Sequence, residues 1–599
     1  MKQEKQTLTE VLDRAWEGRT PNQVMVSTKR KGTWVELSTQ TFRERIRHTA
    51  FGLYDAGIRP GDRVSLHSRN SAEWLICDLA LQQLGAVTVP IYTTQPGKQI
   101  EHILRDSESK LHIVENDSLF AETKPLIKSI STIKGIVSIE KSTHSSIQTL
   151  RDIEAKGKET EADNEQSVRS ILETITPETL ATLIYTSGTT GMPKGVMLSH
   201  GNLAFNVQAS MERVPFRLDE VPGKRFLSYL PLSHVFERMI SYMYLLMGVS
   251  IWYIEEIDEI REDLQTVRPA FFATVPRLLE KLQNGMKARG QEMSGVQKRL
   301  YYWALKLASR YDPSEKGSIV EQWQRRIADS LVYRKIRAQL GGELIGVVSG
   351  GAPLSEEIFR FINGIGLYCG QGYGLTETSP VIAVQDPNHL KPGSCGLPLR
   401  GVEVKIADDG EICVRGANVM MGYYRDPERT NDVLGSDGWL KTGDIGELDE
   451  DGELYVKDRK KDLFKLSTGK YVAPQFIETQ LINSPFIEQA VVLGYHQKFC
   501  SALIVPHWEN VGNRLDRRGL SVKDPDGESP EVRTVIEEEI EKVNKTLSPW
   551  ETVKKFKLLE KMLTIEDGEL TPTLKLKRSV IHERYKEQID AIYQDDELS

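Results

Sequence analysis

The chain contains 599 residues, of which 39% are hydrophobic and 27% are charged. This length exceeds what one hydrophobic core supports and predicts two to four domains, and the ordinary balance of apolar and charged residues excludes a disordered chain. The net charge of −8 at pH 7 disfavours nucleic acid as the main partner.

The cysteines are scattered, and none forms a C-x-x-C pair. They are Cys77, Cys369, Cys395, Cys413 and Cys500. This spacing argues against a disulfide framework or a structural zinc site and favours a reducing, cytoplasmic compartment. Residues 1–20 lack the apolar core of a signal peptide. The uncharged apolar run 239–254 is shorter than the ~20 residues that a spanning helix needs, so we expect a buried element and no integral membrane segment.

Residues 40–110 alternate helical patterns with short apolar runs. Within them, residues 63–92 predict a strand, a helix capped by Ser71 and followed by Gly85, and a second strand. Such alternation indicates βαβ units and a parallel sheet. The same rhythm returns near 340–385, where LIGVVSGGAPLSEEIFRFI predicts a strand, a glycine-rich turn and a helix.

The pattern changes at about residue 400, where short strands are separated by Asp-Gly turns at 409–410 and 451–452. Such turns are hairpin signals. Residues 155–168 are polar and nearly free of large apolar side chains, so we expect a mobile loop or linker there. Residues 284–318 contain a basic and aromatic helical stretch, SGVQKRLYYWALKLASRY.

The segment YTSGTTGMPKGV, residues 185–196, follows the apolar run LATLIY. A loop of glycine, serine and threonine directs backbone N–H groups and hydroxyls at phosphate oxygens, and Lys194 adds a cation. Gly188 and Gly191 permit backbone torsions that other residues resist. The lysine is followed by glycine rather than serine or threonine, and VMLS after it predicts a strand, so a P-loop kinase or GTPase is disfavoured.

This loop resembles that of the adenylate-forming superfamily, which includes acyl-CoA synthetases, luciferases and the adenylation domains of peptide synthetases. Further motifs that resemble the family's follow in the same order. They are LPLSHVFER (230–238), SGGAPLS (349–355), GQGYGLTETSP (370–380), GWLKTGD (438–444), DRKKDLFKLSTGKYVAP (458–474) and LTPTLKLKR (570–578). The resemblance spans residues 10–595 and is nearest to bacterial long-chain fatty-acid–CoA ligases.

The resemblance implies an α/β fold. We expect a large N-terminal domain, residues 1–460, of two doubly wound subdomains and a distorted β-barrel, and a small mobile α+β domain, residues 461–599. The implied reaction is ATP-dependent, AMP-forming ligation of a long-chain fatty acid to coenzyme A through an acyl-adenylate. Two alternatives remain: transfer to an acyl carrier protein, and a catalytically silent acyl- or AMP-binding regulator.

The resemblance also implies roles for single residues. The nucleotide would be bound by Thr186, Ser187, Gly188, Thr189, Thr190, Gly191 and Lys194 at its phosphates, by Gly350, Gly351, Ala352 and Tyr373 around adenine, and by Asp444 at the ribose. Gly374, Thr376 and Arg459 would also bind the nucleotide. Thr186 and Glu377 would be the magnesium-associated pair, since Mg²⁺ favours carboxylates together with substrate phosphates. His234 would lie beside the carboxylate and acyl entrance.

The C-terminal motif would supply the catalytic lysine, Lys575, which reaches the substrate carboxylate and the α-phosphate. Here the sequence departs from the family, because Leu574 stands where glycine is usual. Lys577 and Arg578 lie close by, and strand alternation places Lys575 and Lys577 on the same face. The hinge of the small domain would be Lys461.

The total length, the segment TVPRLLEKL (274–282) and the 284–318 insertion favour a long-chain acid. Expected partners are therefore a long-chain fatty acid, ATP and coenzyme A. Residues 284–318 either pack on their own domain or form a peripheral contact with an anionic membrane surface. The sequence leaves the oligomeric state open.

Overall fold

The computed structural model describes residues 5–145, 147–186, 192–520, 529–571 and 575–594. The chain divides into two compact units. The first consists of Met1–Val275, Arg289–Val404 and Cys413–Lys441, and the second of Pro276–Ala288, Lys405–Ile412 and Thr442–Ser599.

An eight-stranded sheet in the first unit has the order β19-β9-β8-β4-β3-β5-β6-β7. Its strands are β3 (Arg63–His67), β4 (Val87–Ile91), β5 (Leu111–Val114), β6 (Gly135–Ser138), β7 (Gln148–Thr149), β8 (Leu180–Thr186), β9 (Lys194–Ser199) and β19 (Gly422–Tyr423). The run from β8 to β7 is parallel, whereas β9 and β19 are antiparallel additions. The expected βαβ unit is confirmed, since the Ser71 hydroxyl accepts from Trp74 N at the start of the helix between β3 and β4.

A nine-stranded sheet in the same unit has the order β16-β15-β14-β13-β12-β10-β11-β1-β2. Its strands are β1 (Val24–Arg30), β2 (Thr33–Ser38), β10 (Arg225–Ser228), β11 (Ser250–Tyr253), β12 (Phe271–Thr274), β13 (Gly346–Ser349), β14 (Tyr368–Gly374), β15 (Val381–Val384) and β16 (Leu397–Pro398). The strands from β1 to β14 run parallel. The carboxyl ends of β10, β12, β13 and β14 therefore share one edge.

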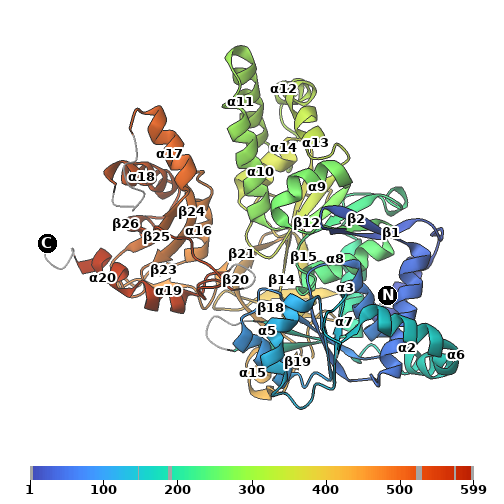
Figure 1. The fold of residues 1–599 in the computed structure, drawn as a ribbon. Helices are drawn as coiled ribbons and strands as arrows, with labels where there is room; N and C mark the ends of the chain where they lie inside the picture. The colour runs from blue at the N-terminus through green and yellow to red at the C-terminus, as the bar shows by residue number, and fades with distance from the viewer. Residues whose placement is uncertain (1–4, 146, 187–191, 521–528, 572–574, 595–599) are drawn as a thin grey trace. The chain divides into compact units, whose positions relative to one another are not determined.

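Helices connect and cover these strands (Figure 1). In the first unit they are α1 (Leu8–Asp13), α2 (Thr39–Asp55), α3 (Ala72–Gln83), α4 (Gly97–Asp106), α5 (Asp117–Ile127), α6 (Leu150–Thr174), α7 (His200–Met211), α8 (Val235–Leu246), α9 (Ile260–Val267), α11 (Gly295–Ser309), α12 (Ile319–Ala328), α13 (Arg334–Gln339), α14 (Glu356–Gly364) and α15 (Pro427–Val433). The expected strand, turn and helix of residues 344–362 are confirmed as β13 and α14.

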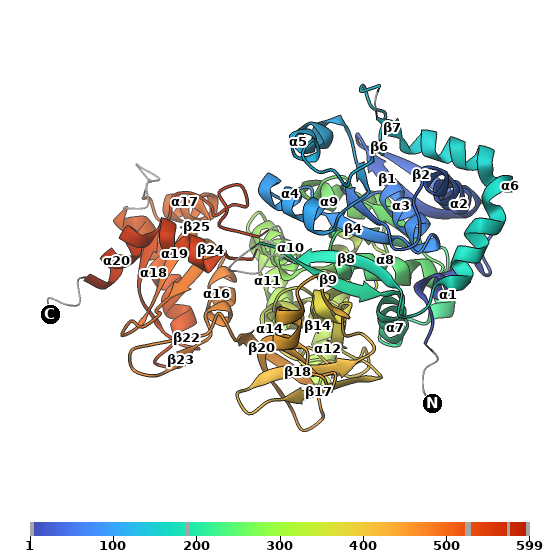
Figure 2. The same cartoon turned by 90° about the horizontal axis from the view of Figure 1, so that it is seen from below.

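The expectation of a loop or linker at residues 155–168 is wrong, because this segment is the middle of α6. A capping box starts the helix: the Thr149 hydroxyl accepts from Asp152 N, and the Asp152 carboxylate accepts from Thr149 N. Helix α6 runs beside α2 in both views (Figures 1 and 2).

Two glycines explain how a polar helix packs so closely on α2. A Cβ on Gly157 would lie 1.8 Å from the His48 carbonyl oxygen, and one on Gly52 would lie 2.0 Å from the Ile153 carbonyl oxygen. The backbones of the two helices therefore touch directly. Ion pairs join the polar flanks, namely Arg45–Glu154, Arg47–Glu161 and Arg47–Glu165. Only a narrow stripe of α6 packs against α2, so most residues of this helix are polar. The polar composition therefore suggested a linker.

Residues 239–254 are buried, as expected, and form most of α8 together with β11. None of the helices in the described part of the chain is both long and apolar enough to cross a membrane. The five cysteines are buried thiols.

A four-stranded sheet, in the order β17-β18-β20-β21, forms where a distorted barrel was expected. Its strands are β17 (Val402–Ile406), β18 (Glu411–Gly416), β20 (Leu440–Leu448) and β21 (Leu454–Arg459). The glycines of both predicted Asp-Gly turns have left-handed backbones, with φ of +83° at Gly410 and +82° at Gly452.

The second unit contains a three-stranded sheet, β24 (Ile487–Leu493), β25 (Cys500–Pro506) and β26 (Val553–Leu558), and a two-stranded sheet, β22 (Phe464–Lys465) and β23 (Tyr471–Val472). Its helices are α10 (Pro276–Arg289), α16 (Pro474–Ile482), α17 (Trp508–Arg517), α18 (Pro530–Asn544), α19 (Arg578–Arg584) and α20 (Lys586–Gln594).

The three-stranded sheet buries both of its faces. Ala502 and Ile504 of β25 belong to a core with residues of α16, α17 and α18, whereas Leu503 and Val505 belong to a core with residues of α19 and α20. This alternation is the period of two that a strand imposes. The α/β fold, with a large N-terminal part and a separate α+β C-terminal part, is as predicted.

Candidate active site

The predicted site residues of the first unit follow the carboxyl ends of parallel strands. Thr186 ends β8, His234 follows β10, Gly350 follows β13, and Glu377 follows β14. Ligands of open α/β sheets bind at this edge, because loops from several strands meet there.

Residues Ser187, Gly188, Thr189, Thr190 and Gly191 lie outside the described part of the chain. The residues on either side of them, Thr186 and Lys194, are paired in the β8–β9 hairpin. His102 of α4 supports the returning strand, since its Nε2 donates to the Pro193 carbonyl at 2.8 Å. Thr186 Oγ1 is buried and has no hydrogen-bond partner among the described residues. A buried hydroxyl in that state is suited to a ligand oxygen or a metal ion.

Lys194, Glu377 and Tyr423 form one cluster. The Lys194 ammonium lies 3.6 Å from the Glu377 carboxylate and 3.8 Å from the centre of the Tyr423 ring. The Tyr423 hydroxyl donates to Glu377 Oε1 at 2.8 Å and accepts from the Lys194 ammonium. The hydroxyl thus bridges the two charges.

Strand pairing positions the tyrosine. Strand β19 pairs antiparallel with β9, so Tyr423 lies opposite Val196, two residues beyond Lys194. Tyr423 N donates to Thr430 Oγ1 at 2.9 Å, and Met420 N donates to the Glu377 carbonyl at 2.9 Å. Burial, and then the neighbouring Glu377 carboxylate, raise the pKa of Tyr423 well above its usual value, so its hydroxyl keeps its proton.

Tyr423 is a residue that the sequence analysis missed. Its only local signal is the stretch Gly422-Tyr423-Tyr424 before the turn residues Asp426 and Pro427. Nothing in that stretch connects it to a lysine and a glutamate in distant segments. The connection arises only when β19 joins the edge of the eight-stranded sheet.

Contacts to its backbone hold the turn that carries Glu377. A short 3₁₀ turn spans Thr376–Thr378. Asn206 of α7 donates to the Thr378 carbonyl at 3.3 Å and to the Val381 carbonyl at 2.8 Å. Gly374 tolerates no side chain, since a Cβ there would lie 1.9 Å from the Pro380 carbonyl oxygen.

The expected adenine pocket residues also lie at this edge. Gly350 N donates to the Thr274 carbonyl at 3.0 Å, and a Cβ on Gly350 would lie 3.1 Å from the Phe236 ring. Gly351 has a φ of +78°, which disfavours other residues, and Ala352 after it is exposed. Tyr373 is half-buried on β14. The packing of Phe236 thus leaves little room for a side chain at Gly350, whereas Gly351 and Ala352 are exposed.

His234 has a structural role in addition to its predicted one. It is the N-cap of α8, and its Nδ1 accepts from Phe236 N at 3.2 Å. Asn70, after β3, holds the preceding loop: it accepts from Leu232 N at 2.7 Å and donates to the Leu230 carbonyl at 2.6 Å. The role of His234 beside an acyl group remains a prediction.

In the second unit, Asp444 and Arg459 face each other on β20 and β21. Arg459 Nε lies 3.0 Å from Asp444 Oδ1, and the aspartate is 3% exposed. A carboxylate has about four acceptor positions, so a carboxylate is a suitable acceptor for hydroxyl groups.

Lys461 is exposed in the turn after β21. The N–H groups of Asp462 and Leu463 both donate to the Arg459 carbonyl at 3.0 Å. The preceding Lys460 is anchored, because its ammonium donates to Asp409 at 2.6 Å and to Glu411 at 2.7 Å. These two hydrogen bonds raise the pKa of Lys460 above its usual value. Lys460 is thus held by its side chain, whereas the side chain of Lys461 is exposed.

The three cations of the last motif have different surroundings. Arg578 is half-buried and pairs with the buried Glu478, with its Nη2 2.8 Å from the carboxylate, and so stabilises the fold. Lys577 is half-buried before α19, and its N–H donates to the Glu569 carbonyl at 2.8 Å. Lys575 is exposed. The structure thus distinguishes Lys575 from Lys577, which the sequence alternation did not.

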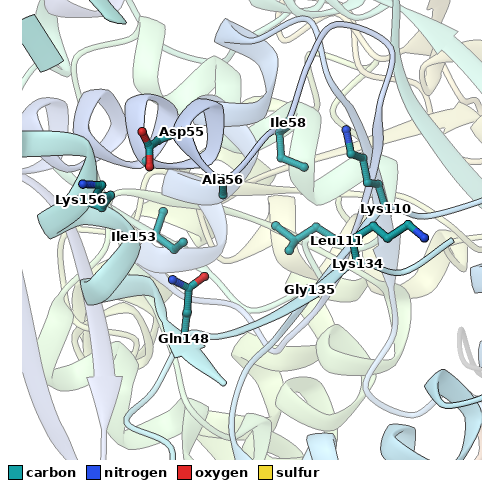
Figure 3. Close-up of a pocket in the computed structure, with 11 residues that line it drawn as sticks. Asp55, Ala56, Ile58, Lys110, Leu111, Lys134, Gly135, Gln148, Ile153 and Lys156 are labelled. Atoms are coloured by element: carbon teal, nitrogen blue, oxygen red, sulfur yellow. The ribbon is translucent and has the colours of Figure 1, made fainter. Parts of the chain in front are cut away.

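A hollow of about 210 Å³ lies at the opposite edge of the eight-stranded sheet, at the amino ends of β5 and β6. Figure 3 shows Asp55 and Lys156 on one side of it and Lys110 and Lys134 on the other. The Lys110 ammonium is bound by the Gly57 carbonyl at 2.8 Å and by Asp62 at 2.7 Å. This hollow is separate from the cluster around Lys194.

Comparisons with known proteins found similarity along most of the chain. The profile of the family described as AMP-binding enzyme matches residues 13–424, and that described as AMP-binding enzyme C-terminal domain matches residues 461–597. The long-chain-fatty-acid–CoA ligase FadD15 of Mycobacterium bovis is 36% identical over 580 residues, covering 96% of this chain and 95% of the relative. The peroxisomal long chain acyl-CoA synthetase 7 of Arabidopsis thaliana is 32% identical, covering 94% and 82%.

A solved structure with a similar fold is the adenylation domain of a carboxylate reductase from Mycobacterium chelonae. It has a TM-score of 0.75 at 22% identity and covers 99% of this chain and 92% of its own. ATP-bound MatB from Rhodopseudomonas palustris has a TM-score of 0.69 at 20% identity, covering 97% and 99%.

We expect Tyr423→Phe to weaken binding of ATP, the ligand that the sequence predicts, by about tenfold or more. This is the size expected when one hydrogen bond to a charged group is lost while the ring remains. Titration calorimetry with the Mg²⁺ complex of ATP measures the effect.

The matched control is Tyr424→Phe, because Tyr424 lies beside Tyr423 and its backbone N–H, which the substitution keeps, donates to the Gly195 carbonyl at 2.8 Å. Its affinity for ATP should equal that of the wild type. Equal affinity in both variants would show that the bridging hydroxyl does not position Lys194 and Glu377.

Proposed function

The chain belongs to the AMP-binding enzyme family, and we propose that it joins a long-chain fatty acid to coenzyme A at the expense of ATP, with an acyl-adenylate as intermediate. The observation that carries the proposal is the end-to-end similarity to a long-chain-fatty-acid–CoA ligase, 36% identity over 96% of the chain. That similarity includes both units rather than the nucleotide-binding part alone.

In the first half-reaction a fatty-acid carboxylate attacks the α-phosphorus of ATP, and pyrophosphate leaves. Two anions must approach each other, so the site must supply positive charge and alignment rather than a nucleophilic side chain. Lys194 is held for this purpose by Glu377 and Tyr423. When ATP binds, its β- and γ-phosphate oxygens become partners of the Lys194 ammonium.

The donor set also fits a magnesium ion that arrives with ATP. Thr186 offers a buried hydroxyl with no partner among the described residues, and Glu377 offers a carboxylate. No cluster of three or more His, Cys, Asp or Glu side chains in the described part of the chain is suited to a metal ion, which fits an ion held largely by phosphates. Magnesium there would neutralise phosphate charge.

The remaining predicted residues bind the nucleoside in this proposal. Asp444 accepts from the ribose hydroxyls, which are two donors that a buried carboxylate suits. Arg459 keeps Asp444 in place and reaches the nucleotide. Tyr373 stacks on adenine, and Gly350 and Gly351 leave room for its edge.

In the second half-reaction the thiol of coenzyme A attacks the acyl carbon, and AMP leaves. We propose that a large domain, residues 1–460, and a small domain, residues 461–599, change their orientation between the two steps. The division falls at Lys461, the first residue after the anchored Lys460 and the first residue matched by the C-terminal family profile. Hinges are a few element-terminal residues that absorb a large torsion change.

The proposal includes a cytoplasmic location, since five buried thiols suit a reducing compartment. It also includes a peripheral membrane contact, which the sequence analysis expected through residues 284–318, where a lipid-soluble acid would be taken up. A long-chain acid partitions into bilayers, because each buried CH₂ contributes ~0.8 kcal/mol.

The proposed activity predicts palmitate-dependent release of pyrophosphate from ATP, followed by palmitoyl thioester formation with coenzyme A. The assay is run with coenzyme A and, separately, with acyl carrier protein as acceptor. If thioester forms only on the acyl carrier protein, the carrier protein rather than coenzyme A is the acceptor. If no fatty acid supports pyrophosphate release, the remaining alternative is the catalytically silent regulator.

Lys575→Ala should slow adenylation by roughly 10²–10³-fold, the effect of losing one preorganised donor at developing charge. Thioester formation from supplied palmitoyl-AMP should persist, because Lys575 acts on the α-phosphate. Both half-reactions are followed by quenched-flow sampling. Lys577→Ala is the control, since its half-buried position assigns it to the start of α19. Loss of adenylation in Lys577→Ala alone would assign the catalytic role to Lys577.

Lys461→Pro should retain palmitate-dependent pyrophosphate release and lose palmitoyl-CoA formation, if the trapped orientation is the adenylating one. Proline fixes φ near −65° and restricts Lys460 before it, so it blocks the torsion change of a hinge. Lys461→Ala should leave both steps nearly intact, because it changes charge but not torsional freedom. Equal loss of both steps with a lowered melting temperature would indicate general damage to the turn. Full turnover by Lys461→Pro would refute the hinge.

A further inference from the structure

The aromatic residues of the 284–318 segment are largely packed inside the first unit. Tyr301 is 7% exposed, and Tyr302 and Trp303 are half-buried. Helix α11, which carries them, packs on α14 and contacts α12. This stretch therefore matches the interpretation of a helix packed on its own domain, and its aromatic rings are poorly placed to meet a membrane.

Exposed apolar side chains lie on the next helix instead. Ile319, Val320 and Trp323 in the first turns of α12 are 85%, 64% and 64% exposed. Their spacing of i, i+1 and i+4 places them on one side of the helix. We call these three residues the α12 patch. In Figure 1, α11 and α12 extend next to each other from the end of the first unit that carries them.

Basic residues surround the patch. Residues 287–337 contain twelve lysines and arginines and five acids, in a chain whose net charge is −8. Arg326 lies one turn after Trp323 and is exposed, as are Lys316 before the helix and Arg334 after it. The region is thus a positive surface on an acidic protein.

Several of the five acids already have partners within the first unit. Asp312 pairs with Arg360, and Asp329 pairs with Arg337 at 2.7 Å. Glu321 accepts from Ser318 N at 2.7 Å as part of a capping box. The Asp329–Arg337 pair removes one acid and one base from the balance of charge, and the hydrogen bonds from Ser318 lower the pKa of Glu321, which keeps its charge. Basic residues still outnumber acidic ones in residues 287–337.

We propose that the α12 patch and its basic neighbours bind the surface of an anionic phospholipid bilayer. Tryptophan and branched aliphatic side chains suit the boundary between head groups and acyl chains, where one end of the ring is apolar and the other is wet. Lysine and arginine near an anionic leaflet each contribute ~1 kcal/mol. The exposed apolar side chains and the basic residues near them in the sequence together match an anionic lipid surface.

The reason for the chain to bind a bilayer rests on the proposed function, since a long-chain acid collects in bilayers. The choice of the α12 patch as the binding surface rests on its exposed side chains and on the local charge. Binding to vesicles requires no turnover, so the test remains valid if the proposed reaction is wrong.

The test is co-sedimentation of the full chain with sucrose-loaded vesicles of phosphatidylcholine containing phosphatidylglycerol, and of phosphatidylcholine alone. The wild type should bind the anionic vesicles at low salt, bind them less as salt rises, and bind neutral vesicles weakly. Ile319→Ser with Trp323→Ser, and separately Arg326→Gln with Arg334→Gln, should each lower the partition constant about tenfold or more, given the contributions of buried apolar and basic groups.

Two control variants carry the same chemical changes elsewhere. Tyr495→Ser removes an aromatic side chain that is 61% exposed in the second unit, and Lys158→Gln with Arg169→Gln removes two exposed cations from α6. Both should bind vesicles like the wild type. Melting temperatures close to the wild type verify that each variant is folded.

Three outcomes would overturn the proposal. The first is that the wild type does not bind anionic vesicles at low salt. The second is that the patch variants bind as strongly as the wild type. The third is that the wild type ignores vesicles but self-associates in a way that the patch variants abolish, measured by sedimentation velocity, which would assign the patch to a second copy of the chain.

Discussion

The Tyr423 hydroxyl connects the Lys194 ammonium to the Glu377 carboxylate, and these two charged groups come from distant parts of the chain. The proposed ligand site of the first unit depends on this contact. Lys194 comes from β9 and Glu377 from the turn after β14, so the two large sheets must be correctly aligned for the pair to form. The two-residue strand β19 supplies the third member by pairing with β9. A charged pair of this kind is sensitive to small displacements. Backbone hydrogen bonds beside it, such as that from Met420 N to the Glu377 carbonyl, limit such displacements.

In each unit, predicted site residues of opposite charge are already paired with each other. Lys194 has Glu377 as its partner, and Asp444 has Arg459, before any substrate is present. In the proposed reaction, binding of ATP replaces one set of charge-assisted hydrogen bonds by another, so its net free energy is a difference between the two sets. Lys575 and Lys461 are exposed, and the proposal gives them the steps in which the domains change orientation.

Motif order predicted the fold class, and the strands before Thr186 and Gly350 could be read from their apolar runs. The position of these residues at the carboxyl ends of the strands comes from the structure. Contacts between distant segments could not be predicted in this way. Tyr423 has no chemical signal of its own, and its role depends on β19 pairing with β9. The alternation around Lys575 and Lys577 left two candidates, and only burial distinguishes them. The roles of Asp444, Arg459, Lys461 and Lys575 in the reaction remain predictions.

The error at residues 155–168 has a practical side. A polar stretch without large apolar residues is where a protein engineer would insert a tag, a reporter domain or a protease site, since such stretches are usually exposed loop tips. Here the stretch is the centre of a helix whose glycine meets the backbone of α2 without an intervening side chain. An insertion there would separate two backbones in direct contact and break the ion pairs beside them. The turn at Asp451–Gly452, with its left-handed glycine, is the better place to add sequence to this protein.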